Sequence, residues 1–195
     1  MRRIRGRIIL FFISVSMILC SCSELKGNKL INNKEEQQML FRNGDEKYAN
    51  KRFQDILSAI EKKDKNKIIS MFSGNIRSNL REGDIDKLFD FIVGNVEKWE
   101  KRGGPGVSES VNSGEKSKTI NSYYNLYTTE ETYFFFIEDC QINTADTNGE
   151  GLVLLLVVKE EDRMKIYDDN QKILFDNGNK LSPYGVYIPF YEDAK

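Results

Sequence analysis

Four segments between residues 107 and 159 leave this sequence few choices of fold, because the first three follow a period of two and the fourth is a short apolar run. A period of two is typical of β-strands, whose successive side chains point to opposite faces of a sheet. The separators are short and rich in turn residues, such as Ser113-Gly114, and short links join antiparallel neighbours. The pattern therefore predicts an antiparallel meander of the segments 107–111, 118–127, 131–142 and 151–159.

Two features of the C-terminal third extend this sheet. Residues 152–158 are all apolar, which is typical of a central strand that is covered on both faces. Met164, Ile166 and Tyr167 are expected to form a further strand. Beyond it, 173–175 and 186–188 are expected to be short extended pieces of an extension, 168–195, that packs on the domain.

Helical periodicity precedes the strands. Apolar residues repeat at helical spacing and predict one buried stripe on a helix, formed by Ala49, Phe53, Ile56, Leu57 and Ile60. Asp64 can cap a short second helix that carries Ile68 and Phe72. A third apolar stripe runs from Ile85 to Trp99 and predicts a helix that stops at the glycines and proline of 103–106.

The first residues are typical of a secretory signal peptide, with a basic start before a short apolar run, residues 8–19. As a helix this run rises about 18 Å, too little to cross a hydrocarbon core of roughly 30 Å. The next residues, Leu19-Cys20-Ser21-Cys22, resemble a bacterial lipobox, with a branched apolar residue three places before the lipidated Cys and a small residue directly before it. Cys22 meets both conditions, whereas Cys20 follows the bulky Leu19. An ordinary cleaved signal or an uncleaved short anchor are the alternatives.

Processing at Cys22 predicts a protein that acyl chains, such as palmitate, hold on the outer face of the cell membrane. Removal of residues 1–21 takes four Arg from the 29 basic side chains, which leaves 25 against 30 acidic ones and a net charge of −5. Anchoring then depends on the lipid and not on charge attraction to anionic membranes. Residues 22–44 are expected to be a flexible tether, with a helix over 34–41 as the alternative, and 45–167 the folded domain.

Composition excludes several classes of function. The chain has no His, so Ser-His-Asp and Cys-His relays are impossible and the commonest zinc and haem sites are absent. A net charge of −1 over all 195 residues argues against a nucleic-acid binder. The acidic stretches 146–151 and 168–179 lack the spacing of a calcium-binding EF-hand. We therefore predict no metal site, no cofactor and no nucleic-acid partner, and a buried, inert Cys140.

Helices followed by a curved antiparallel sheet resemble the nuclear-transport-factor-2-like fold, an α+β cone with helices packed on its concave face. The stretch 56–73, an amphipathic helix, a charged break at Asp64 and a short apolar helix, is similar to the opening of that superfamily. The chain more closely resembles a Gram-positive lipoprotein family known as domain of unknown function 5104. The resemblance lies in the lipobox, in Trp99 followed by the Gly-Pro junction, and in the terminal stretch 185–189. This resemblance brings no catalytic residues to the chain.

A cone of this kind has a cavity between helices and sheet, so a non-catalytic module that binds a small apolar ligand or a protein partner is the first functional hypothesis. The aromatic residues expected to line its wall, with filling of the core as the alternative, are Trp99, Tyr124, Phe134 and Phe136.

The second hypothesis is an isomerase- or hydratase-like enzyme. Members of the resembled fold use a pocket carboxylate as base and a tyrosine as oxyanion donor, and here Asp139 or Glu138 with Tyr123, Tyr124 or Tyr127 could fill those roles. We favour the non-enzymatic function. The third hypothesis is a homodimer through the open sheet face, unless the C-terminal tail covers it, with an aromatic surface formed by Tyr123, Tyr127, Tyr133 and Phe135.

Overall fold

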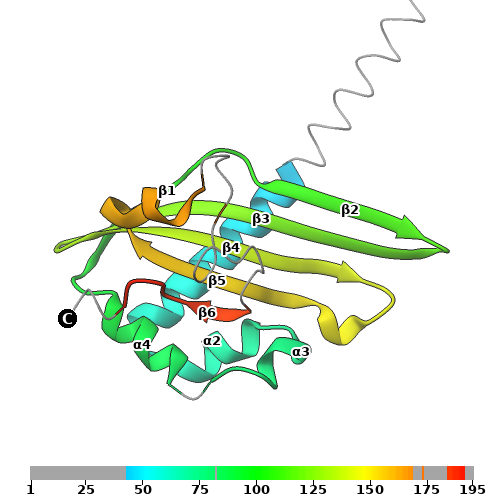
Figure 1. Cartoon of the computed structure of the whole chain (residues 1–195), viewed down its shortest axis with the longest axis horizontal. Helices are drawn as coiled ribbons and strands as arrows, with labels where there is room; N and C mark the ends of the chain where they lie inside the picture. Colours follow the sequence, from blue (N-terminus) through cyan, green and yellow to red (C-terminus); the bar gives the residue numbers. More distant parts are fainter. Residues whose placement is uncertain (1–42, 82, 169–172, 174–183, 192–195) are drawn as a thin grey trace, which may run out of the picture. The chain divides into compact units, whose positions relative to one another are not determined.

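The computed structural model describes residues 43–81, 83–168, 173 and 184–191. The chain divides into two compact units, residues 1–44 and 45–195. The second unit is an α+β domain in which helices are followed by a curved, open, six-stranded sheet (Figure 1). The predicted signal segment, Cys22 and the alternative helix over 34–41 lie outside the described residues.

A long helix includes residues 43–61 and buries the stripe predicted from its sequence. Ala49, Phe53, Ile56, Leu57 and Ile60 are all buried, Phe53 and Ile56 completely. The helix ends at a turn where Lys63 has a φ of 51°.

Three shorter helices follow, α2 (Lys65–Met71), α3 (Gly74–Arg77) and α4 (Asp84–Phe91). The cap predicted for the first of them is confirmed, because the Asp64 carboxylate accepts a hydrogen bond from the backbone N–H of Lys67 at 2.9 Å. Ser73 caps α3 in the same way, accepting from the Ile76 N–H at 3.3 Å.

The prediction of a helix from Ile85 through Trp99 is wrong in its second half. Helix α4 ends at Phe91, and Trp99 lies in strand β1 (Val96–Lys101). Tyr133 stops the helix, since its hydroxyl accepts from the Val93 N–H and donates to the Phe91 carbonyl, both at 2.9 Å.

Gly94 then turns the chain into strand β1. Its φ is +80°, and an added Cβ would lie 2.9 Å from the hydroxyl oxygens of both Thr128 and Thr129. Only glycine combines that φ with so close an approach. Val96 and Trp99 thus have helical spacing in the sequence, but the turn at Gly94 places them in a strand.

The four strands predicted between residues 107 and 159 are confirmed. They are β2 (Gly106–Asn112), β3 (Glu115–Thr128), β4 (Thr132–Asn143) and β5 (Gly151–Lys159), all antiparallel to their chain neighbours. Ser113 and Gly114 form the tight turn between β2 and β3, both with positive φ. A short 3₁₀ helix, η1 (Thr147–Gly149), connects β4 to β5.

The sheet order is β1-β3-β4-β5-β6, and β2 also pairs with β3. Strand β3 therefore has two partners along one side: β1 pairs with 124–128 and β2 pairs with 115–121. The last strand, β6 (Gly185–Tyr187), pairs in parallel with 154–156 of β5. Strand β5 is inside the sheet and buried on both faces, as its unbroken apolar run predicted.

The strand expected around Met164 and Ile166 is instead a 3₁₀ helix, η2 (Glu160–Ile166). Its three acids lie in the first turn and its two bases in the last, and Arg163 and Lys165 pair with Glu160 and Asp162 three residues earlier. These local charge pairs favour a helical turn over an extended chain.

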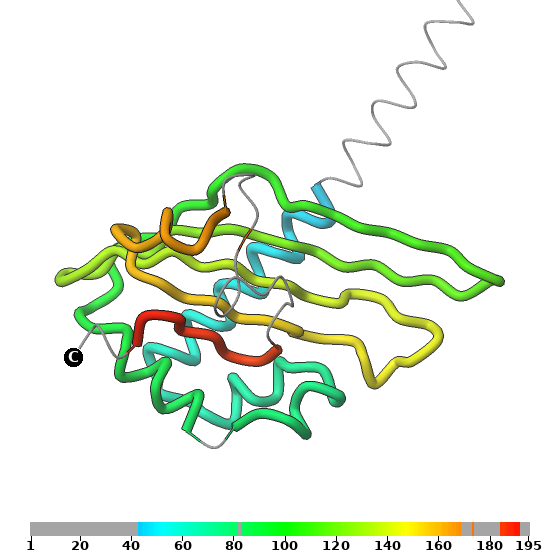
Figure 2. Tube along the Cα trace, viewed as in Figure 1, coloured from blue at the N-terminus to red at the C-terminus, as the bar shows by residue number. Residues whose placement is uncertain are grey.

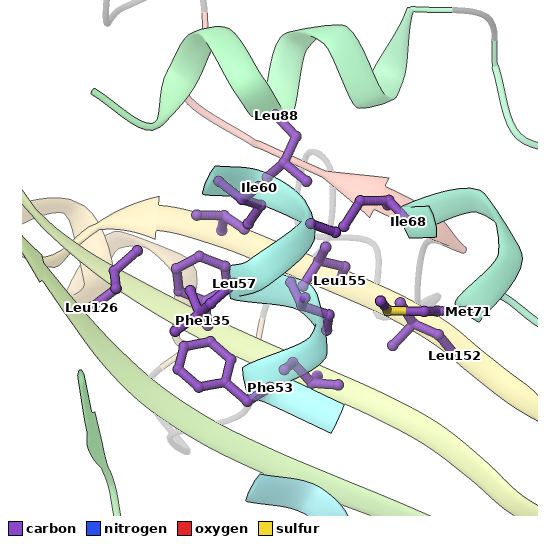
Figure 3. Close-up of a cluster of buried hydrophobic side chains, with 14 of the residues drawn as sticks. Phe53, Leu57, Ile60, Ile68, Met71, Leu88, Leu126, Phe135, Leu152 and Leu155 are labelled. Atoms are coloured by element: carbon purple, nitrogen blue, oxygen red, sulfur yellow. The ribbon is translucent and has the colours of Figure 1, made fainter. Parts of the chain in front are cut away.

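Two apolar clusters lie on the two faces of the sheet. One joins the helices to the sheet and centres on Phe53, Leu57, Leu88, Phe135 and Leu155 (Figure 3). The other lies on the opposite face, where η2 and later residues pack on β4 and β5, and consists of Phe134, Phe136, Leu154, Leu156, Val158 and Ile166. We call these the helix face and the outer face.

Candidate functional site

The structure separates the four aromatic residues that were expected to share one pocket wall. Trp99 and Tyr124 lie on the helix face, with ring centroids 5.6 Å apart. Phe134 and Phe136 lie on the outer face. Tyr124 is paired across the strands with Phe135 and not with either of these phenylalanines, so the four side chains cannot line one cavity.

Packing fills the space beside Trp99 and Tyr124. The Phe53 ring of the long helix stacks on Tyr124 at 4.1 Å and meets the edges of Trp99 at 5.5 Å and Phe135 at 5.2 Å. Tyr124 also donates from its hydroxyl to the Asn50 side-chain oxygen at 3.0 Å. These rings form part of the core between helix and sheet.

The aromatic surface proposed for dimerisation is also divided between the faces. Tyr133 and Phe135 are completely buried on the helix face. Tyr123 packs against the outer-face cluster. Tyr127 donates from its hydroxyl to Glu100 at 3.0 Å, and the Lys98 ammonium lies 4.4 Å from its ring centroid.

Asp139, the candidate base, is 2% exposed and has partners on both carboxylate oxygens. Oδ1 accepts from the Tyr48 hydroxyl at 2.9 Å, and Oδ2 accepts from Nε of Arg52. Arg52 also donates to the Tyr48 hydroxyl oxygen at 3.0 Å, which closes a ring of three side chains. Burial, followed by the negative charge of Asp139, raises the pKa of Tyr48 to about 12.

This arrangement joins the long helix to strand β4. A general base must offer a lone pair to a substrate proton, and Asp139 offers its lone pairs to Arg52 and Tyr48. The three groups therefore act as a buried polar link in the core. Tyr123, Tyr124 and Tyr127, which were expected beside this carboxylate, make none of its hydrogen bonds in the described part of the chain.

The outer face holds a different set of polar groups, arranged in rows across β3, β4 and β5. The register places Tyr123 opposite Phe136 and Leu156, and Asn125 opposite Phe134 and Val158. Since every second residue of a strand shares a face, the next row is Asn121, Glu138 and Leu154.

Two groups of that row lack partners among the described residues. Glu138 makes no hydrogen bond or ion pair there, and burial raises the pKa of its carboxyl. The side-chain oxygen of Asn121, directly opposite on β3, is buried and accepts no hydrogen bond. Buried polar atoms normally have partners, so this pair can receive hydrogen-bond donors from a bound molecule.

The other end of the outer face is closed by charged groups. Arg102 donates from Nη1 to Glu160 at 2.6 Å and to the Asn125 side-chain oxygen at 3.3 Å. Arg163 donates to the same Glu160 oxygen at 2.9 Å, and its guanidinium lies 5.8 Å from the Phe134 centroid. These contacts hold η2 against one end of the rows of polar and aromatic residues on the outer face.

The described residues offer few other reactive or metal-binding groups. Cys140 is partly buried, and burial raises the pKa of its thiol, which disfavours the reactive thiolate. Among residues 43–81, 83–168, 173 and 184–191, no three His, Cys, Asp or Glu residues gather as metal ligands. In the same ranges no helix has both the length and the apolar composition needed to cross a membrane.

Sequence reasoning missed Tyr48, Arg52 and Asn121. Tyr48 and Arg52 are one helical turn apart, so their common face could be predicted, but Asp139 lies 87 residues beyond Arg52. Asn121 gave no signal of its own, because its position opposite Glu138 depends on the register of β3 and β4.

These observations define an α+β domain with a packed helix face and an outer face that carries rows of polar and aromatic residues. Comparison with protein families finds a match to the domain of unknown function 5104 over residues 55–160. The chain belongs to this family. No curated protein matches it.

Proposed function

We propose that this protein is a lipoprotein, anchored through Cys22 on the outer face of the cell membrane, whose domain is a non-catalytic binding module. The lipobox-like residues 19–22 support the anchor. The proposal also retains the kinship with the nuclear-transport-factor-2-like cone, which the order of helices and curved sheet supports.

The observation that carries the binding function is the pair of Glu138 and Asn121 on the outer face. A half-buried carboxyl and a buried amide oxygen, both without partners in the described residues, face the same side beside the Tyr123 and Phe136 rings. Small-molecule sites combine apolar walls with a few polar groups of this kind. A ligand with N–H or O–H donors next to an apolar group would satisfy both acceptors.

The enzymatic alternative receives less support. Its carboxylate, Asp139, is held by Arg52 and Tyr48, and Phe53 fills the space beside Tyr124. The register places Asn121 of β3 and Leu154 of β5 opposite Glu138, and neither residue has a hydroxyl group.

Native mass spectrometry of the full chain, released gently from detergent, tests the binding function. We expect a reproducible extra mass that is reduced in Glu138→Ala and kept in Glu109→Ala, a control on exposed strand β2. An extra mass equal in both variants would place the ligand elsewhere, and a chain without any extra mass would contradict a small-molecule site.

The anchor has its own test. Labelled palmitate should be incorporated by the full chain and by Cys20→Ala, but not by Cys22→Ala. Continued labelling of Cys22→Ala would contradict the assignment while leaving the outer-face site untouched.

A further inference from the structure

Strand β2 is an edge strand with unusual self-complementarity. All seven of its residues are exposed, and it pairs only with β3 among the described strands. Its central residues, Val107-Ser108-Glu109-Ser110-Val111, read the same in both directions. A palindromic strand that meets a second copy of itself in antiparallel direction places identical residues opposite one another.

The backbone of β2 has hydrogen-bonding groups that point away from β3. Lys116 of β3 exchanges hydrogen bonds with Thr144, its N–H donating to the Thr144 hydroxyl at 2.7 Å and its carbonyl accepting from the Thr144 N–H at 2.9 Å. The Lys116–Val111 pair is therefore not hydrogen bonded, and the alternation of antiparallel ladders extends this to Glu109 and Val107. The N–H and C=O groups of these three β2 residues point to the open edge.

Exposed sheet edges are usually protected by lysine, proline or a bulge. Strand β2 has no lysine and no proline, its register with β3 is unbroken, and its one charged side chain, that of Glu109, is paired with Lys118. Val107 and Val111, on either side of Glu109 along β2, are 42% and 70% exposed. Strand β2, the green edge strand in Figure 2, therefore presents two exposed valines beside open backbone groups.

We propose that β2 pairs with β2 of a second copy of this chain, antiparallel and with Glu109 on the two-fold axis. In this register Val107 faces Val111 of the second copy, Ser108 faces Ser110, and the outward groups of residues 107, 109 and 111 bond each other. The arrangement is isologous, as a two-fold dimer requires. It joins the two sheets at their edges and leaves the outer-face site free.

Glu109 is the one residue that would face an identical charge. Its carboxylate is paired with the Lys118 ammonium at 3.0 Å, so each copy brings a partly compensated charge to the axis. Lys118 also holds Asp45 at 2.6 Å, which fixes the ammonium beside the edge. Opposed like charges destabilise cross-strand pairs, and this compensation reduces that cost.

Cysteine trapping in the full chain tests the register, because the strand pair is a small interface. In a hydrogen-bonded antiparallel pair the two Cα atoms are about 5.5 Å apart, within the range of a disulfide. Glu109→Cys should therefore form a disulfide-linked dimer under mild oxidation. Val107→Cys, equally placed on the edge, should not, since its twin lies about four residues or roughly 13 Å further along the strand.

A proline substitution in β2 provides a second test of the proposed dimer. Val111→Pro removes an N–H that points outward, so it should abolish trapping in the Glu109→Cys background and leave the thermal melt nearly unchanged. Val111→Thr, which keeps the N–H and the β-branch, should preserve trapping. Equal trapping of Val107→Cys and Glu109→Cys, trapping that survives Val111→Pro, or no dimer from Glu109→Cys would overturn the proposal. A Glu109→Cys adduct with a different protein, in place of the dimer, would also overturn it.

Discussion

The guanidinium of Arg52 and the carboxylate of Asp139 join the long helix to strand β4 through an ion pair shielded from solvent. The Arg52 side chain is 20% exposed and that of Asp139 is 3% exposed. Removing one member of such a pair leaves a charge with little water around it, which costs more than the pair contributes when intact.

Asp139→Ala should therefore lower the free energy of unfolding by about 3 kcal/mol, measured by urea denaturation. The control is Asp55→Ala in the same helix, where Lys51 and Asp55 form an exposed pair. That variant should lose less than about 0.5 kcal/mol. Equal losses in the two variants would contradict a structural role for Asp139.

Phe53 is the ring on which the helix face depends. Truncation to alanine removes contacts with Tyr124, Trp99 and Phe135 at once and should cost about 3–5 kcal/mol. Trp99 is the single tryptophan of the chain, so its fluorescence reports on this packing directly. We expect a red-shifted native emission in Phe53→Ala and a smaller shift in Phe53→Leu; unchanged emission in both would mean that Phe53 is not packed on Trp99.

Substitution of two glycines with nearly the same φ distinguishes the free-energy cost of a left-handed backbone from that of a steric clash. Gly94 and Gly103 have φ of +80° and +78°, but an added Cβ meets Thr128 and Thr129 only at Gly94. Gly103→Ala should cost about 1 kcal/mol for the left-handed backbone. Gly94→Ala should cost clearly more, because the Thr129 hydroxyl is fixed by the Asn95 N–H. Similar thermal shifts in the two variants would argue against the close approach.

Glu138 is expected to make the free energy of unfolding fall as pH rises. Burial raises the pKa of its carboxyl, so the folded state binds the proton more tightly than the unfolded state does. Its contribution is most favourable below the unfolded pKa and is lost as pH rises through the folded pKa. Glu138→Gln should raise the melting temperature at neutral pH and have little effect at acidic pH. A variant that melts lower than the wild type at neutral pH would mean that the ionised carboxylate has a stabilising partner.

The strands could be predicted from the sequence because their cause is local. Alternation in three segments, the unbroken apolar run of the fourth and the Ser113-Gly114 turn act over a few residues, and β2 to β5 form where those signals place them. The helix expected through Trp99 failed for a non-local reason: Gly94 packs against Thr128 and Thr129, at the end of β3, and the local pattern does not reveal this contact.

The assignment of faces failed for a related reason. Alternation shows that Phe134 and Phe136 share a face, but only the β3–β4 register shows which residues of β3 share it with them. A register shift of one residue exchanges the two faces of a strand, so Tyr124 could be matched with the wrong partners. The same dependence on register hides the pairing of Asn121 with Glu138.

The two halves of strand β3 differ in burial, and this difference affects local unfolding of the domain. Its second half carries the buried Tyr124 and Leu126, whereas Glu115 and Lys116 at its start are exposed and face a fully exposed β2. Amide protons of one continuous strand should therefore exchange with solvent at two different rates, slowly where the helices cover it and quickly near the hairpin tip. A single strand would then belong to two units of local unfolding, and the hairpin could rearrange on meeting a partner without loosening the core behind it.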